Sequence, residues 1–600
     1  MQVPAFSPRA GHDWRFPAAL AWAAACLVLT PGPLVADDHA AERFRGAGRA
    51  DPIRVTNVRR TAGPGAGQST ITFDLAWDHS WRASWEVGEK EHGGPGGPRL
   101  ENWDAAWVFA KFLAPGSDRH AHAMLSARAA DHRVPTGAAI DVGRTDDGTA
   151  GVGVFVYRAV AGQGPNDFKG VTLRWVHGAD LPADADLRVF AVQMVRVPEG
   201  GFWAGDGATD FVRGQFSSGT STAPVRIASE APMTLGGEAP GVLNNRDGAG
   251  MNLSHTDDFS SDVPVSLAAA FPKGYGGFYC MRQEMTQQQY VDFLNTLPFD
   301  RQAQRTIPQG EKKLGPDAPP GTAVLVGEKN AGGHRAAVRI ASSGTPDVRE
   351  GVVVDRKTFI ASASVVRRGR PAVYATDNPH VVCNGINHID GIAFAAWAGL
   401  RPMTELEYEK ACRGPLRPVA GEYAWGTAGI AGIDPGGGNY VLQNGGAAEE
   451  TVVWEGAGGA DATHGNAPCS VTNRKLGGPV RGGVFATATS DRVSAGASYW
   501  GILDLSGNVN EVVVPVGVVR GRVFAGTHGT GDDPPWGDLL CGIRGGGYGN
   551  GGGHYRGFGG DDLFRVSNRF MTATPGVYNT ARHFMNGFRG VRTAPARPAE

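Results

Sequence analysis

The residues best suited to acid–base chemistry lie in the segment TELEYEKACRG, residues 404–414. Glu405, Glu407 and Glu409 place three carboxylates close to the guanidinium of Arg413. Catalytic sites use carboxylates beside a cation in this way. However, Glu409 and Arg413 are four residues apart, so on a helix they form an ordinary ion pair between successive turns. We therefore interpret the group as support for a helix rather than as a catalytic site.

A second segment rich in functional side chains is IRGGGYGNGGGHYRGFGGDDLFRVSNRF, residues 543–570, which is mainly glycine, aromatic residues, arginine and asparagine. Tyrosine and arginine supply broad contact area in recognition surfaces, and asparagine and glycine supply adaptable hydrogen bonding. This composition favours a ligand-binding surface within residues 544–589. The candidate binding residues are Tyr548, Asn550, His554, Tyr555, Arg556, Phe558, Arg565, Asn568, Tyr578, Asn579 and Asn586.

The N-terminus has the features of an export signal. Two arginines precede the apolar run FPAALAWAAACLVL, residues 16–29, and small residues then lead to a polar stretch. This pattern predicts a signal peptide over residues 1–36, a linker over 37–52, and a periplasmic, cell-surface or secreted protein. The apolar run is short for a membrane span, so no transmembrane segment is expected in the mature chain. A retained N-terminal anchor and a lipid at Cys26 are the alternatives.

Composition limits the fold and the partners. The 600 residues exceed what one core normally supports, so more than one domain is expected. The 89 glycines and 39 prolines disfavour long helices, because both residues penalise helix interiors. A net charge of −2 without a long basic run makes nucleic acid an unexpected partner. Five cysteines follow the signal without metal-site spacing, and we expect buried free thiols at Cys280, Cys383, Cys412, Cys469 and Cys541.

Residues 53–195 are predicted to form a β-sandwich domain. Six runs rich in β-branched and aromatic residues are separated in several places by turn clusters such as AGPGAGQ. The runs lie at residues 53–58, 71–77, 105–112, 153–160, 171–178 and 186–195.

The second predicted domain, residues 196–596, contains only three helical signals. The segments at 286–297 and 404–414 each begin with a capping box, a threonine followed three residues later by Gln or Glu. The segment at 390–399 ends in a glycine suited to a left-handed cap. Residues 300–380 resemble an insertion, with strand-like runs TAVLVG and AAVRIA.

Seven motifs occur in order along this second domain: VPEGGFWAGD, FYCMRQEMTQQQYVDFLN, INHIDGIAFAAWAGLRPMTELEYEKACRG, YAWGT, GILDLSGNVNE, IRGGGY and NGFRGVR. Residues 197–594 thereby resemble the formylglycine-generating enzyme, or sulfatase-modifying factor, domain family. The resemblance implies a C-type-lectin-like fold with little regular secondary structure. The expected fold class is therefore mostly β with α+β character, an N-terminal β-sandwich followed by this domain.

The resemblance raises a question about catalysis. Members that make formylglycine use two copper-binding cysteines shortly after the RGG motif, because soft thiolates select Cu(I). In this chain those positions fall near Asn550 and Tyr555, and Gly547 replaces the usual serine. An amide and a phenol cannot replace a thiolate pair. Copper-dependent formylglycine formation is therefore not expected.

The resemblance also bears on calcium and on iron. The family holds a calcium ion at the turn GNVNE, where Asn508 and Glu511 offer hard oxygen ligands, while Asn510 replaces the usual bulky aromatic residue. The alternative is a hydrogen-bonded turn that needs no ion. Iron enzymes of the superfamily take histidine ligands largely from a helical N-terminal domain, and that place here is β-rich.

These observations favour an exported, noncatalytic recognition protein that binds a protein or glycan through residues 544–589. The resemblance places this segment over the former reaction site, and a related scaffold carries diversified positions there in retroelement-mutated receptors. It also implies that Arg569 is internal, beside a carboxylate such as Asp561 or Asp562. The alternatives are a metal-dependent oxidoreductase using iron or copper, and an assembly part of a larger envelope complex.

Overall fold

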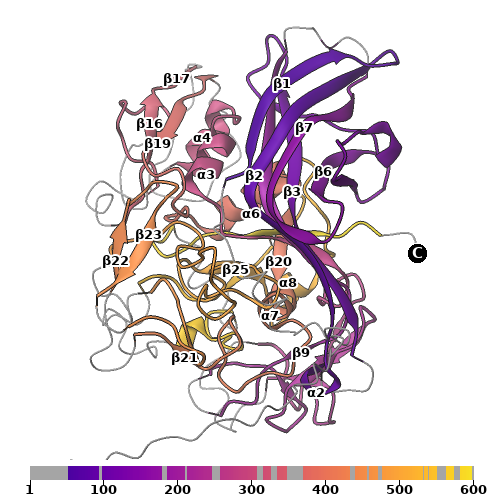
Figure 1. Ribbon diagram of the computed structural model, residues 1–600, viewed down its shortest axis with the longest axis vertical. Helices are drawn as coiled ribbons and strands as arrows, with labels where there is room; N and C mark the ends of the chain where they lie inside the picture. The colour runs from indigo at the N-terminus through magenta and orange to yellow at the C-terminus, as the bar shows by residue number, and fades with distance from the viewer. Residues whose placement is uncertain are drawn as a thin grey trace, which may run out of the picture. The chain divides into compact units, whose positions relative to one another are not determined.

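The six strand-like runs predicted between residues 53 and 195 are all strands in the computed structural model (Figure 1). They are β1 (Arg54–Ala62), β2 (Gln68–Glu86), β3 (Arg99–Leu113), β6 (Gly151–Arg158), β7 (Gly162–Val176) and β8 (Asp186–Val197). Shorter elements join them: α2 (Glu89–His92), β4 (Ala121–His122), η1 (Ala129–Asp131) and β5 (Ala138–Arg144). Along β2 the buried residues Ile71, Phe73, Leu75 and Trp77 alternate with part-buried ones, because successive side chains of a strand point to opposite faces.

The structure describes residues 52–92, 97–178, 181, 185–209, 212–245, 257–306, 315–325, 334–347, 369–432, 440–455, 458–469, 476–531, 533–537, 539–549, 562–572 and 582–596. The predicted signal peptide, and all but the last residue of the predicted linker, lie outside these ranges. Within the described ranges, no helix is both long and apolar enough to cross a membrane.

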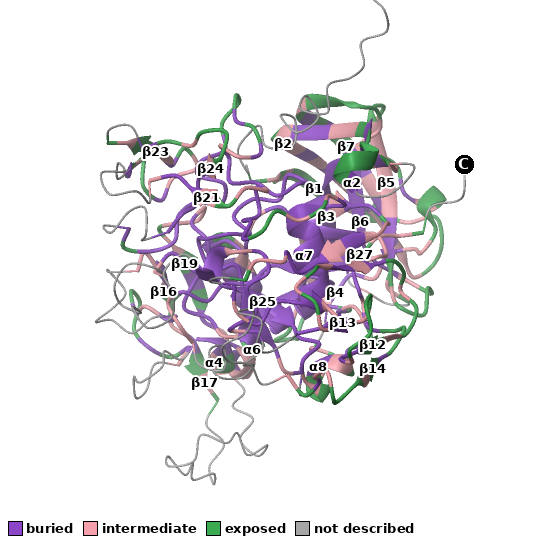
Figure 2. Ribbon diagram, turned by 90° about the horizontal axis from the view of Figure 1, so that it is seen from below, coloured by how far each residue is buried: buried purple, intermediate pink, exposed green. Residues whose placement is uncertain are grey.

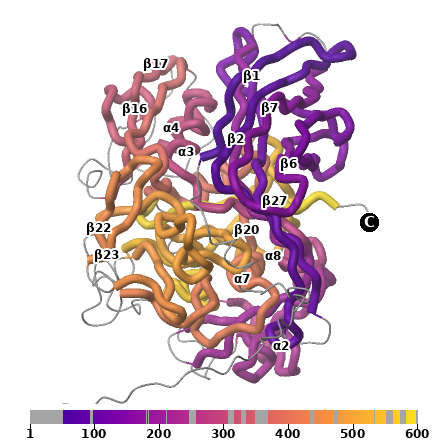
Figure 3. Tube along the Cα trace, viewed as in Figure 1, coloured from indigo at the N-terminus to yellow at the C-terminus, as the bar shows by residue number. Residues whose placement is uncertain are grey.

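These strands belong to a 13-stranded sheet that continues into the C-terminal part of the chain (Figure 3). Its main order is β1-β2-β3-β8-β15-β27-β20-β25-β26. The later members are β15 (Phe278–Met281), β20 (Arg401–Thr404), β25 (Glu511–Val514), β26 (Gly542–Arg544) and β27 (Gly590–Thr593). Because β15 pairs antiparallel with both β8 and β27, hydrogen bonding runs across the domain boundary predicted near residue 195.

Side chains of the N-terminal strands also bind the C-terminal part directly. The indole nitrogen of Trp107 donates to the carbonyl of Ala398 at 2.7 Å, and Lys111 Nζ donates to the carbonyl of Gly531 at 3.0 Å. Both donors are buried on β3. These bonds hold the end of a helix and a distant loop against the same strand.

The three predicted helices are present. They are α3 (Gln287–Leu294), α6 (His388–Trp397) and α7 (Glu405–Arg413). Thr286 and Thr404 complete the capping boxes that the sequence indicated. Helix α6 begins two residues earlier than expected, because Asn387 and Asp390 form a further capping box. Figure 2 shows α6 and α7 largely in the colour of buried residues, and every residue of α7 is buried.

Short elements complete the C-terminal part. They are β9 (Phe202–Ala204), β10 (Ser217–Ser218), β11 (Val225–Ile227), β12 (Met233–Leu235), β13 (Leu243–Asn244), β14 (Val265–Leu267), α4 (Phe299–Arg305), β16 (Val338–Ser342), β17 (Thr345–Pro346), β18 (Gly369–Arg370), β19 (Val373–Thr376), β21 (Gly429–Ile430), β22 (Tyr440–Gln443), β23 (Thr451–Trp454), β24 (His464–Gly465), α8 (Val519–Arg522) and η2 (Asp562–Phe564). The strand-like run AAVRIA overlaps β16, whereas the described residues of TAVLVG make only an isolated bridge at Ala323. The predicted mostly-β class, with a large N-terminal sheet, is confirmed.

Candidate functional site

The segment between the motifs RGG and GFR leaves the central sheet after β26 and returns to it at β27. Both ends of the segment bind the turn at residues 508–510. The amide of Tyr548 donates to the carbonyl of Asn508 at 2.7 Å, and the amide of Asn510 donates to the carbonyl of Met585 at 2.8 Å. Asn508 has a φ of +57°, a left-handed conformation that asparagine tolerates better than most residues. The turn therefore holds the start and the end of the segment close together.

The sequence predicts eleven binding residues for this segment. Seven of them lie outside the described residues: Asn550, His554, Tyr555, Arg556, Phe558, Tyr578 and Asn579.

The four described candidates are mainly internal. Tyr548, Asn568 and Asn586 are 3%, 4% and 1% exposed. Asn586 Oδ1 accepts a hydrogen bond from Asn510 at 3.0 Å. The guanidinium of Arg565 lies 4.9 Å from the centre of the Tyr423 ring. These side chains pack within the domain and contribute little to its surface.

The carboxylates of α7 belong to a buried network of ion pairs. Glu405 accepts from Arg569 Nε at 2.6 Å, and Glu409 accepts from Arg544 Nη2 at 2.9 Å. Glu409 also pairs with Arg413 one turn along the helix, which confirms the structural interpretation of these residues. Every carboxylate named here faces an arginine, so the network pairs the charges that α7 buries.

Arg569 is internal as expected, but its carboxylates are Glu405 and, at 2.9 Å, Asp257. Of the two expected partners, Asp562 lies beside Arg565 instead, and Asp561 is outside the described residues.

The structure brings the predicted residue Tyr548 together with three residues outside the predicted set, His334, His583 and Phe584. These four residues are here called the His334 cluster. His334 Nδ1 lies 2.8 Å from the Tyr548 hydroxyl, and the His334 ring stacks on Phe584 with 4.4 Å between ring centres. The centre of the His583 ring lies 4.3 Å from the centre of the Phe584 ring. His334, His583 and Phe584 are half-buried, so the cluster reaches the surface at the ends of the 544–589 segment.

Backbone contacts fix the His334 cluster. The buried side-chain amide of Asn384 donates through Nδ2 to the carbonyl of His334 at 3.1 Å and to the carbonyl of Phe584 at 2.8 Å. Burial lowers the pKa of His334, and burial together with the nearby His334 lowers the pKa of His583. Both rings are therefore neutral near neutral pH, and neutral imidazole both donates and accepts hydrogen bonds. The cluster can stack on a flat ligand and hydrogen-bond to it.

The calcium site implied by the resemblance does not fit the described side chains. Asn508 Oδ1 accepts a hydrogen bond from the amide of Val480 at 2.9 Å. Glu511 accepts from Arg589 Nε at 2.9 Å, and a guanidinium at that distance opposes a divalent cation. Across the described ranges, no group of three or more His, Cys, Asp or Glu side chains is placed to hold a metal ion. Asn508 and Glu511 instead match the alternative, a hydrogen-bonded turn.

The thiols do not fit a copper site. The sequence has no cysteine after Cys541, and all five described cysteines are free and buried, as expected. Burial raises the pKa of Cys541 and of Cys412 to about 12 in each case. Copper binding needs accessible thiolates, and these thiols stay protonated at neutral pH.

Comparison with known proteins supports the resemblance seen in the motifs. Residues 268–594 match a family model described as the sulfatase-modifying factor enzyme 1-like domain. A search of curated proteins found no match.

Proposed function

The chain belongs to the family of sulfatase-modifying factor enzyme 1-like domains. We propose that it is a noncatalytic ligand-recognition protein. In this proposal the protein is exported and binds a protein or glycan at the cell surface or in the periplasm. The family scaffold is retained, while the copper chemistry of the formylglycine-generating members is lost.

The observation that carries the proposal is the lack of a usable thiol beyond the RGG motif. No cysteine occurs from residue 542 to residue 600. Cys541 precedes β26, is 0% exposed, and has its pKa raised to about 12 by burial. A buried thiol that is held in its protonated form is a poor copper ligand.

Ligand binding is proposed to centre on the His334 cluster and the 544–589 segment that starts and ends beside it. Aromatic rings that are rigidly held and partly exposed supply contact area at little entropic cost. His334 is held by Tyr548 and Phe584, and Asn384 fixes the backbone below both rings. Among the eleven residues predicted from the sequence, those outside the described ranges remain candidates for the same surface.

Metal analysis separates this proposal from the oxidoreductase alternative. The purified chain should contain neither copper nor iron in stoichiometric amount, and it should consume no oxygen when a cysteine-containing peptide is added. Stoichiometric copper or iron together with thiol-dependent oxygen consumption would refute the proposal.

Binding assays test the surface itself. Glycan and protein arrays identify a ligand, and the affinities of His334→Leu and Phe584→Leu are then compared with that of the unchanged chain. Loss of a central aromatic contact should weaken binding by about tenfold or more. His464→Leu is the matched control, because His464 is an exposed histidine whose side chain pairs with Asp461 instead. Equal affinities for all three variants would place recognition elsewhere.

A further inference from the structure

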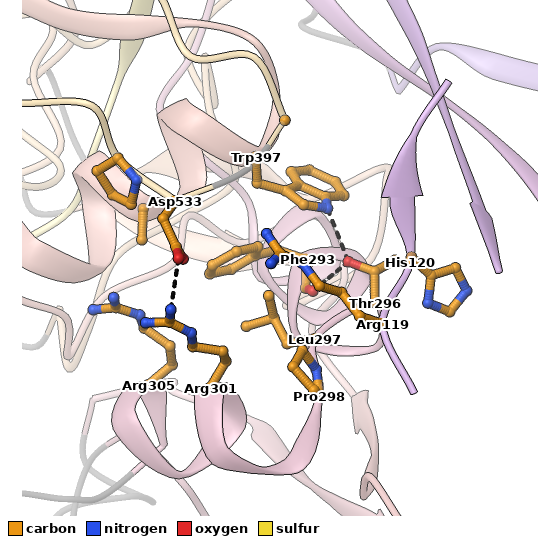
Figure 4. A pocket seen from close by; sticks show the side chains of 13 residues that line it. Arg119, His120, Phe293, Thr296, Leu297, Pro298, Arg301, Arg305, Trp397 and Asp533 are labelled. Atoms are coloured by element: carbon orange, nitrogen blue, oxygen red, sulfur yellow. Dashed lines mark hydrogen bonds and ion pairs between the residues drawn. The ribbon is translucent and has the colours of Figure 1, made fainter. Parts of the chain in front are cut away.

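A pocket lies where four segments meet: the loop between β3 and β4, the α3–α4 region, α6, and residues 531–534 (Figure 4). Trp397 and Phe293 form part of its walls, and Arg119, Arg301, Arg305 and Asp533 also line it. The indole nitrogen of Trp397 donates to Thr296 Oγ1 at 2.8 Å, which fixes that wall. Two of these segments are held against β3, which binds Ala398 at the end of α6 and Gly531.

The side chains that line this pocket carry a net positive charge. Its described lining residues include three arginines and a single aspartate, a formal charge of +2. Arg301 Nη2 donates to Asp533 Oδ2 at 2.6 Å, and Figure 4 shows this pair beside Arg305. His120 adds no charge at neutral pH, because burial and the nearby Arg188 lower its pKa.

Arg305 is a buried cation whose carboxylate contact is long. It is 9% exposed, and its described carboxylate contact is Asp390 Oδ1 at 3.4 Å. Arg582 binds the same carboxylate more closely, through Nε at 2.7 Å and Nη2 at 2.9 Å. The charge of Asp390 is thus offset mainly by Arg582. A buried guanidinium without a full counter-charge is unfavourable, and an anion in the pocket would relieve it.

The volume of the pocket and its apolar walls indicate which kind of anion fits. Its cavity volume of about 40 Å³ has room for roughly three water molecules, which suits a carboxylate with a short chain. Phe293 and Trp397 are 2% and 5% exposed and offer apolar walls for hydrocarbon. Guanidinium groups bind a planar carboxylate in two-pronged fashion. Phosphate has oxygen atoms on every side and leaves such walls unmatched.

We propose that this pocket binds the carboxylate of a short-chain organic acid, held by Arg301 and Arg305 with its hydrocarbon part against Phe293 and Trp397. This site is separate from the His334 cluster and does not depend on the proposed recognition function. Asp533 competes with the ligand for Arg301 and so sets the affinity.

Fluorine NMR with trifluoroacetate as the probe tests the site in the full chain. The probe signal should broaden when protein is added at millimolar probe concentration, propionate should displace it, and phosphate should displace it less well. Trifluoroacetamide, which lacks the charge, should not broaden. Arg305→Gln and Arg301→Gln should each weaken probe binding by about tenfold. Asp533→Asn should strengthen it, because the substitution frees Arg301.

Arg54→Gln is the matched control, since Arg54 forms an exposed pair with Asp78 on the N-terminal strands. A thermal melt verifies that each variant is folded. Unchanged affinity in both arginine variants, equal broadening of the amide and the acid, or no broadening with the unchanged chain would each overturn the proposal. If the arginine variants do not fold, the test rests on Asp533→Asn. A probe affinity in that variant that is unchanged or weaker would then refute the proposed carboxylate site.

Discussion

Replacement of Asp206 by asparagine should stabilise the protein at neutral pH and leave its stability in acid nearly unchanged. Asp206 is 5% exposed, and burial raises its pKa from 3.8 to about 6. Its Oδ1 accepts a hydrogen bond from the amide of Ala208 at 2.9 Å, which asparagine can also accept. Arg413 is the nearby cation, and it keeps Glu409 and Glu422 as partners after the substitution.

The sign follows from proton binding. Between pH 3.8 and about 6 the folded protein holds the Asp206 proton more tightly than the unfolded chain does, so stability falls as pH rises through this window. Above this pH window Asp206 is ionised in both states, and the free-energy cost of burying its charge no longer changes with pH. Since one pKa unit corresponds to about 1.4 kcal/mol, the shift amounts to about 3 kcal/mol at neutral pH. Asparagine is uncharged throughout, so the variant should gain up to about that much.

Urea denaturation of both proteins across the acid-to-neutral range measures the effect. The difference in free energy of unfolding should be small in acid and should grow through the titration window of Asp206. Asp461→Asn serves as the control, because Asp461 is exposed and hydrogen bonds from Thr463 and His464 lower its pKa, so that variant should not gain stability. A loss of stability by Asp206→Asn at neutral pH, or an unchanged pH profile, would refute the reasoning.

Three further outcomes are expected. Thr404→Ala removes the N-cap of α7 and should cost about 1 kcal/mol in urea denaturation, whereas Thr404→Ser should cost little. Gly391→Ala should destabilise α6, because the added Cβ would lie 2.3 Å from the Phe588 ring, and such overpacking costs about 1–3 kcal/mol; a gain in melting temperature would contradict this contact. Excess chelator should leave the melting temperature unchanged, because Asn508 Oδ1 accepts from Val480 and the Arg589 guanidinium beside Glu511 opposes a divalent cation. A fall of several degrees would show that calcium binds.

Local sequence patterns predicted the regular elements well. The strands between residues 53 and 195 follow from alternating, β-branched runs, and α3 and α7 begin at capping boxes formed by neighbouring residues. Such signals involve groups a few positions apart, so tertiary contacts are not needed to recognise them. Helix α4 was missed because Pro298 precedes it without a side-chain cap and its polar sequence FDRQAQR shows no clear apolar face.

Burial at the candidate site could not be derived in the same way. Tyr548, Asn568 and Asn586 have the composition of a binding surface, yet they are buried. A polar side chain can lie inside when distant groups satisfy it, and the hydroxyl of Tyr548 meets His334, which is 214 residues away in the chain. No pattern among neighbouring residues indicates that two positions so far apart in the chain come into contact.

The amino-acid sequence alone determined the family and the lack of a cysteine pair after the RGG motif, because seven ordered motifs and a missing thiol pair are properties of composition and order. Only the tertiary structure decided which side chains remain available for binding. The His334 cluster and the pocket at Arg305 each unite residues from segments far apart in the chain, and their charge and exposure arise from that convergence. Long-range packing sets those properties, since each depends on the groups that the fold places beside a residue.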